Sequence, residues 1–98
     1  MEVQKCYYAS FNVDKVEVWR TEFYQDKNSV FSEIENSKDD ILEQLIDNSL
    51  FYNEKEIKKI FKSAIQGLKQ YGMFKDKGNE LDFFIAEQPI WENYEQKK

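Results

Sequence analysis

Residues 53–72 read NEKEIKKIFKSAIQGLKQYG, and this stretch decides the fold class. Asn53 followed by Glu56 is the capping-box pattern that begins many helices. Gly72 stands where a glycine commonly ends a helix. We therefore predict a helix over residues 54–71. One face of this helix is apolar and needs a second layer to cover it, because its apolar residues recur at helical spacing: Ile57, Ile60, Phe61, Ala64, Ile65, Leu68 and Tyr71.

The segment before this helix begins with a strand pattern. Residues 3–13 alternate between the two faces of a strand, with Tyr7, Ala9 and Phe11 on one face and Cys6 and Tyr8 on the other. A turn at 12–15 leads into a second predicted strand, residues 16–24, so the chain opens with a hairpin. The apolar residues of the second strand fall in two phases. Either a bulge near Val18 reconciles them or both faces are partly covered.

Residues 26–49 are less regular. We expect a loop at 26–29, and residues 30–36 fit either a short helical turn or a strand. Ser37 then precedes the acidic residues Asp39 and Asp40, which suits the start of a helix, because carboxylates stabilise the positive end of the helix dipole. This helix should end near residues 48–49.

The segment after the long helix predicts a second hairpin. Residues 73–75 and 81–87 fit two strands, and Pro89 should end the second of them. Residues 81–86 are apolar on both faces, which is typical of a central, well-covered strand. Residues 76–82 are superficially similar to a calcium loop. Their glycine comes too early and the final Glu is missing, so we interpret them as a hairpin turn.

The order of elements is therefore β-β-α-α-β-β, which predicts an α+β fold in two layers. We expect an antiparallel sheet of three to four strands with two helices on one face. The 98 residues fit a single domain, 1–98. Residues 89–98 form a short C-terminal tail that either folds back on the sheet or leaves it uncovered, with frayed last residues.

Composition excludes several kinds of chemistry. The chain has no His, which excludes Ser-His-Asp and Cys-His catalysis within it, and its single Cys6 forms neither an internal disulfide nor a Cys/His zinc site. Cys6 lies in the first alternating segment, so we expect a buried structural thiol. We expect no cofactor and no metal site.

The sequence also suggests a location and a source. No apolar leader and no apolar run long enough for a membrane span is present, which favours a cytoplasmic protein that does not enter a membrane. Lys outnumbers Arg 13 to 1, and Asn, Ile, Tyr and Phe are common. These residues have A/T-rich codons, so we infer a low-GC bacterium, or its phage or mobile element.

The chain is rich in aromatic residues, with eight Phe, six Tyr and two Trp. Periodicity assigns half of them to the core: Tyr7, Phe11, Phe31, Phe51, Phe61, Tyr71, Phe74 and Phe83. The others have no core position that periodicity requires: Tyr8, Trp19, Phe23, Tyr24, Tyr52, Phe84, Trp91 and Tyr94. From this second group we predict a partner-binding surface on the uncovered face of the sheet, formed by Tyr8, Trp19, Phe23, Trp91 and Tyr94. The alternative is that the C-terminal tail covers this face itself.

Two charged helix faces are further candidates for binding. The acidic face comprises Asp39, Asp40, Glu43 and Asp47. It fits a solvated helix surface best, with a Mg²⁺ or Ca²⁺ site or an imitation of DNA phosphates as alternatives. The basic face of the long helix comprises Lys55, Lys59 and Lys62. These lysines are best explained by attraction to the acidic neighbouring helix. Binding of phosphates or of an acidic partner is the alternative.

These observations favour a small, acidic, non-enzymatic protein-binding module of the inhibitor type, such as an immunity, antitoxin or anti-defence protein. A carboxylate-based metal-dependent enzyme is one alternative, and a nucleic-acid accessory protein that uses the lysine stripe is another. The net charge of −5 and the single Arg argue against nucleic acid as a partner. A homodimer through the open face of the sheet is compatible with all three hypotheses.

Overall fold

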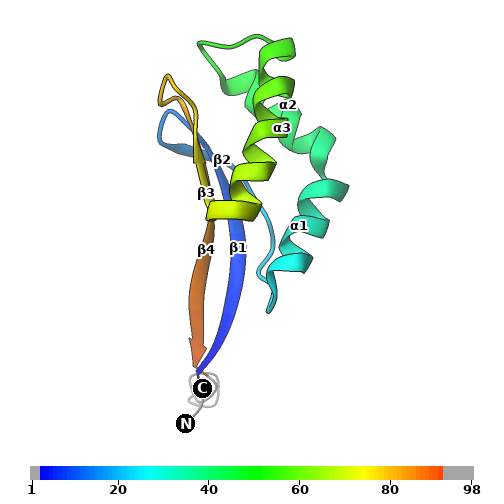
Figure 1. The fold of residues 1–98 in the computed structure, drawn as a ribbon, viewed down its shortest axis with the longest axis vertical. Coiled ribbons are helices and arrows are strands. Elements are labelled where there is room, and N and C mark those ends of the chain that lie inside the picture. Colours follow the sequence, from blue (N-terminus) through cyan, green and yellow to red (C-terminus); the bar gives the residue numbers. More distant parts are fainter. Residues whose placement is uncertain (1–2, 92–98) are drawn as a thin grey trace.

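Residues 3–91, described by a computed structural model, form an α+β fold with one four-stranded antiparallel sheet and three helices. The strand order in the sheet is β2-β1-β4-β3. Figure 1 shows the three helices on the same face of the sheet, whose other face carries no described helix. The elements are β1 (Val3–Val13), β2 (Val16–Arg20), α1 (Lys27–Asn36), α2 (Lys38–Asn48), α3 (Glu54–Tyr71), β3 (Met73–Lys75) and β4 (Leu81–Trp91).

The predicted antiparallel sheet is confirmed, and its centre is the pair formed by β1 and β4. These strands pair along their full length, from Val3 opposite Trp91 to Val13 opposite Leu81. Pro89 was expected to end the last strand, but β4 continues through it. Among the described strands, only β1 pairs with β4 beyond Phe84, so Pro89 lies on the side of this sheet where β4 is an edge, and proline is tolerated on an edge.

Of the two alternatives for the second strand, the structure shows the bulge near Val18. Phe11 pairs with Trp19 and Asn12 pairs with Glu17, so Val18 is the extra residue between the two pairs. The strand ends at Arg20 rather than at Tyr24. The chain nevertheless continues beside β1, because the backbones of Tyr7 and Tyr24 exchange two hydrogen bonds of 2.6 and 2.9 Å.

The long helix α3 forms as its sequence predicts. The side chain of Asn53 accepts a hydrogen bond from the Glu56 amide, and the Glu56 side chain accepts one from the Asn53 amide. At the other end Gly72 has a positive φ of 77°, a conformation that glycine adopts without a steric cost. The helix α2 also ends at the predicted position. Ser37 precedes it, but its side chain makes no capping hydrogen bond.

The helix α1 is the main departure from the predicted order, which contained two helices. Asp26 was expected in a loop, yet its side chain accepts a hydrogen bond from the Ser29 amide and caps α1. Residues 30–36 are therefore helical rather than extended. Only Val30 and Ile34 of this helix are buried, which is too short a pattern to separate a helix from a strand in the sequence.

The core lies between the sheet and the helices. Each fully buried Phe, Leu or Ile contributes about 1.5–3 kcal/mol, so this layer supplies the main stabilisation of the fold. Two aromatic residues assigned to the core are instead exposed: Phe51 by 67% and Tyr71 by 72%. The core residues are Ala9, Phe11, Val13, Val30, Ile34, Ile41, Leu42, Leu45, Ile57, Phe61, Ala64, Leu68, Leu81 and Phe83.

These two exceptions have a local cause. Phe51 belongs to the loop that joins α2 to α3, where helical periodicity does not apply. Tyr71 is the last residue of α3, and Gly72 turns the chain directly into the edge strand β3.

Candidate functional site

The face of the sheet opposite the helices is the first candidate site. Because side chains alternate along a strand, the burial of Ala9 and Phe11 under the helices directs Tyr8 and Ser10 to the other face. Cross-strand pairing places Phe84 opposite Ser10 and Ala86 opposite Tyr8. This open face therefore carries two aromatic side chains from its central strands.

An apolar band, defined here as Met73, Phe84, Ala86, Tyr8 and Phe23, crosses this face from β3 to the segment after β2. Met73 pairs with Phe84 across β3 and β4. At the other end the rings of Tyr8 and Phe23 lie 4.8 Å apart. Met73 is 52% exposed and Phe23 is 46% exposed, so both ends of the band reach solvent.

A charged group borders the apolar band. The Arg20 guanidinium lies 4.8 Å from the centre of the Tyr8 ring, a cation–π distance. Its Nε also donates to Glu17 Oε1 at 3.0 Å, and the Ser10 hydroxyl donates to the same oxygen. Partial burial would raise the pKa of Glu17, but the hydrogen bonds from Ser10 and Arg20 outweigh burial and lower it. Glu17 is therefore a carboxylate that fixes Arg20 against Tyr8.

The structure brings together two of the five residues predicted to bind a partner. Tyr8 and Phe23 are in contact on the open face. Trp19 was expected on the open face, but the bulge at Val18 turns its ring to the core side, 5.9 Å from the ring of Phe11. Tyr94 and the side chain of Trp91 lie outside the part of the chain that the structure describes.

The acidic face of α2 is exposed at all four predicted positions, Asp39, Asp40, Glu43 and Asp47. Three of these residues line a shallow hollow beside the start of α3: Asp39, Glu43 and Asp47. Within residues 3–91, no group of three or more Asp, Glu, Cys or His side chains is placed to hold a metal ion.

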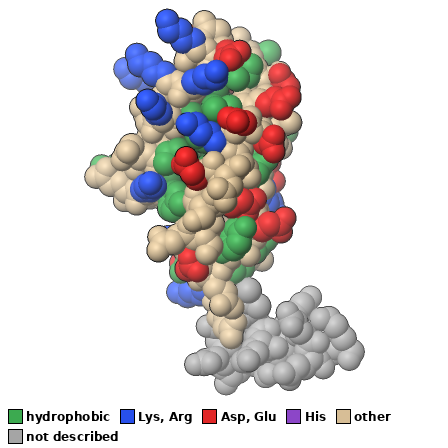
Figure 2. All heavy atoms as spheres, turned by 90° about the vertical axis from the view of Figure 1, so that its right-hand side faces the viewer, with side chains coloured by type: hydrophobic (Ala, Val, Ile, Leu, Met, Phe, Trp, Pro, Cys, Tyr) green, Lys and Arg blue, Asp and Glu red, His purple; other side chains and the backbone are tan. Residues whose placement is uncertain are grey.

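The basic face of α3 is likewise exposed at Lys55, Lys59 and Lys62. Figure 2 looks onto the helix side of the molecule and shows basic side chains gathered toward the upper left, with acidic ones mainly to the right. Charges of opposite sign therefore occupy different parts of this surface.

Two buried carboxylates, which sequence analysis missed as a group, join the β3–β4 turn to the α2–α3 loop. Asp76 and Glu80 are only 7% and 3% exposed. The Tyr52 hydroxyl donates to Asp76, and the Ser49 hydroxyl and the Leu50 amide donate to Glu80 at 2.6 Å each. The interpretation of residues 76–82 as a hairpin turn is confirmed.

Hydrogen bonding explains how Asp76 stays ionised although it is buried. Burial alone would raise the pKa of Asp76. Hydrogen bonds from the Tyr52 hydroxyl and from the amides of Leu81 and Gly78 outweigh burial and hold the pKa below its usual value. The signal in the sequence was Asp76 two residues before Gly78, a spacing typical of an Asp side chain that bonds to the backbone two residues on.

Cys6 is buried, as predicted, with 3% of its surface exposed. Its Sγ lies 3.5 Å from the carbonyl oxygen of Gln88 on β4. None of the described helices is long and apolar enough to cross a membrane.

No protein-family model, curated protein or solved structure matches this chain.

Proposed function

We propose that the chain is a small, non-enzymatic protein-binding module of the inhibitor type, which binds a folded protein through the apolar band. The observation that supports this most is the position of the band on the face of the sheet without described helices (Figure 1). A contiguous exposed apolar surface rimmed by polar groups is typical of a protein interface.

The composition of the band supports the same proposal. Aromatic and Arg side chains are enriched at the centres of interfaces, since they bury much area with few rotatable bonds. Here Tyr8 and Phe23 pack on each other, and Glu17 holds Arg20 over the Tyr8 ring. These side chains are already ordered by intramolecular contacts, which lowers the entropy that binding must overcome.

Inhibition is the second part of the proposal. The exposed acidic face of α2 lies on the opposite side of the sheet from the band. A partner bound on the band would thus leave four carboxylates free to repel nucleic acid or an acidic substrate from the complex. We expect the captured protein to lose its activity when the chain is bound.

The test is an affinity capture from a lysate of the organism that encodes the chain. The tagged wild type should retain a protein that the tagged Tyr8→Ser/Phe23→Ser double variant does not retain. The matched control is Leu50→Ser/Phe51→Ser, which changes two apolar residues that are 80% and 67% exposed and lie outside the band. Equal capture by all three proteins would contradict the proposal.

A further inference from the structure

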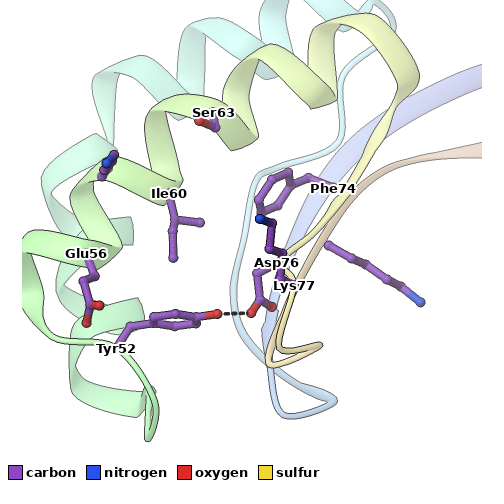
Figure 3. Close-up of a pocket in the computed structure, with 9 residues that line it drawn as sticks. Tyr52, Glu56, Ile60, Ser63, Phe74, Asp76 and Lys77 are labelled. Atoms are coloured by element: carbon purple, nitrogen blue, oxygen red, sulfur yellow. Dashed lines mark hydrogen bonds between the residues drawn. The ribbon is translucent and has the colours of Figure 1, made fainter.

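A groove of about 840 Å³ runs between α3 and the β3–β4 hairpin, on the helix side of the sheet. Figure 3 shows Ile60 on α3 and Phe74 on β3 pointing into the space between these elements, with the Tyr52 ring at one end. All three side chains are partly buried and pack against the core, so they form an apolar floor. Lys59, Ser63 and Lys77 add polar groups to the lining.

Positive charges outnumber negative ones in the lining of this groove, with Lys59, Lys75 and Lys77 against two acids. Both acids accept hydrogen bonds within the fold: Glu56 accepts from the Asn53 amide at 3.0 Å, and Asp76 accepts three hydrogen bonds. Lys59 and Lys77 are exposed, and neither forms an ion pair within 4.0 Å with an acid in residues 3–91. A groove with unengaged cations in a chain of net charge −5 favours an anionic ligand.

The groove is bordered by the free edge of β3. The Gly72 carbonyl oxygen accepts a hydrogen bond from the Ile85 amide, and the Asp76 amide donates one to the Leu81 carbonyl oxygen. The backbone polar groups of Gly72 and Asp76 therefore point to β4. Because this direction alternates along an antiparallel strand, the N–H and C=O groups of Lys75 point away from β4.

The helix covers the other outward-pointing position on this edge. The Met73 carbonyl oxygen lies 3.4 Å from the point where a Cβ atom on Gly67 of α3 would be. Among the described strands only β4 pairs with β3, so the edge is open to a partner at Lys75.

We propose that this groove binds an extended acidic peptide segment of a protein partner, which adds to the edge of β3 by pairing with the backbone of Lys75. Strand addition supplies main-chain hydrogen bonds, and pockets for alternate side chains supply selectivity. An apolar side chain of the peptide lies between Ile60 and Phe74, and a carboxylate faces Lys59 and Lys77.

The register of the sheet also predicts which peptide residue is preferred opposite Lys75. Phe74 faces the core, so the Lys75 side chain points to the open face. The peptide residue directly opposite Lys75 therefore points there too, and opposite charges in such a cross-strand pair attract. The preferred peptide has an acid at this position, next to the residue that enters the groove.

The test uses a bead-displayed library of random seven-residue peptides and the whole chain. We expect the recovered peptides to be enriched in Asp and Glu and to contain an apolar residue. Their affinity should fall by about tenfold or more for Lys59→Glu/Lys77→Glu, because like charges then face the peptide. The matched control, Lys55→Glu/Lys62→Glu, makes the same charge change on α3 outside the groove and should retain the affinity within about twofold. Recovery without acidic enrichment, or equal weakening by both variants, would overturn the proposal.

Amide hydrogen exchange tests the backbone pairing separately. A saturating amount of a recovered peptide should slow exchange at the Lys75 amide, while the Phe74 amide, which already faces β4, serves as the reference. Unchanged exchange at Lys75 with the peptide bound would refute strand addition, and it is the result expected for a small anion that occupies the groove. Tyr8→Ser/Phe23→Ser leaves the groove intact, so failure of the apolar band and failure of the groove give different results.

Discussion

Replacement of Asp76 by Ala should cost this fold a large part of its stability. The substitution leaves three donors without their acceptor: the Leu81 amide, the Tyr52 hydroxyl and the Gly78 amide. The Leu81 amide makes a buried bond and loses about 1–3 kcal/mol when it is unpaired. The other two donors can reach water in part and lose about 0.5–1 kcal/mol each.

The sum is about 3 kcal/mol, against a total stability of about 5–15 kcal/mol for a domain of ordinary size. Urea unfolding followed by circular dichroism would measure it. The control is Asp82→Ala on β4, whose half-buried carboxylate makes no hydrogen bond with a described residue and whose loss should cost about 0.5 kcal/mol or less. Equal loss of stability in the two variants would refute the role assigned to Asp76.

Three further predictions concern the fold. The native pKa of Asp76 is lowered, so its stabilisation is present above its unfolded-state pKa of about 3.9 and is lost as the pH falls through the native value. The free energy of unfolding should therefore fall more steeply below about pH 4 for wild type than for Asp76→Asn, and parallel pH profiles would contradict this. Gly72→Ala should cost about 1 kcal/mol in urea unfolding, because φ is positive there and nothing lies within 4 Å of an added Cβ. Trp19→Ala should cost about 2 kcal/mol or more, measured in the same way, because the ring packs on Phe11. A cost below about 0.5 kcal/mol would indicate an exposed ring.

Local rules in the sequence predicted the elements whose stability is mainly local. The capping box at Asn53, the apolar stripe and Gly72 together define α3, and each is an interaction between neighbours in the chain. The alternation in residues 3–13 likewise predicted β1. In both cases the pattern is long enough to separate a period of 3.6 from a period of 2.

The helix α1 and the continuation of β4 depend on distant contacts, which the sequence does not display. Glu33 of α1 accepts hydrogen bonds from the Glu22 amide and the Tyr24 hydroxyl, and these contacts anchor the helix to the segment after β2. Similarly, β4 passes through Pro89 at a point where β1 is its only partner among the described strands. The sequence rules applied to Pro89 and to the α1 segment consider only neighbours along the chain. Contacts between distant residues override these rules.

The open face of the sheet was predicted in part from the sequence, and the groove was not predicted. Tyr8 and Phe23 were assigned correctly to the open face, whereas the bulge at Val18 reversed the direction of Trp19. A bulge at this position was one of two alternatives, and the sequence did not indicate which side chain it would turn inward. The groove beside α3 was missed because it combines residues from a loop, a helix and an edge strand, which no spacing in the sequence relates.

The central claim is that the apolar band is the surface that contacts a partner, and hydroxyl-radical footprinting of the wild-type chain tests it most directly. Phe23 and Met73 are about half exposed in the free chain, and Leu50 and Phe51, which lie outside the band, are more exposed. In complex with the captured protein, oxidation of Phe23 and Met73 should fall strongly, while oxidation of Leu50 and Phe51 stays at its free level. Protection of Leu50 and Phe51 with unchanged oxidation of Phe23 and Met73 would contradict the account.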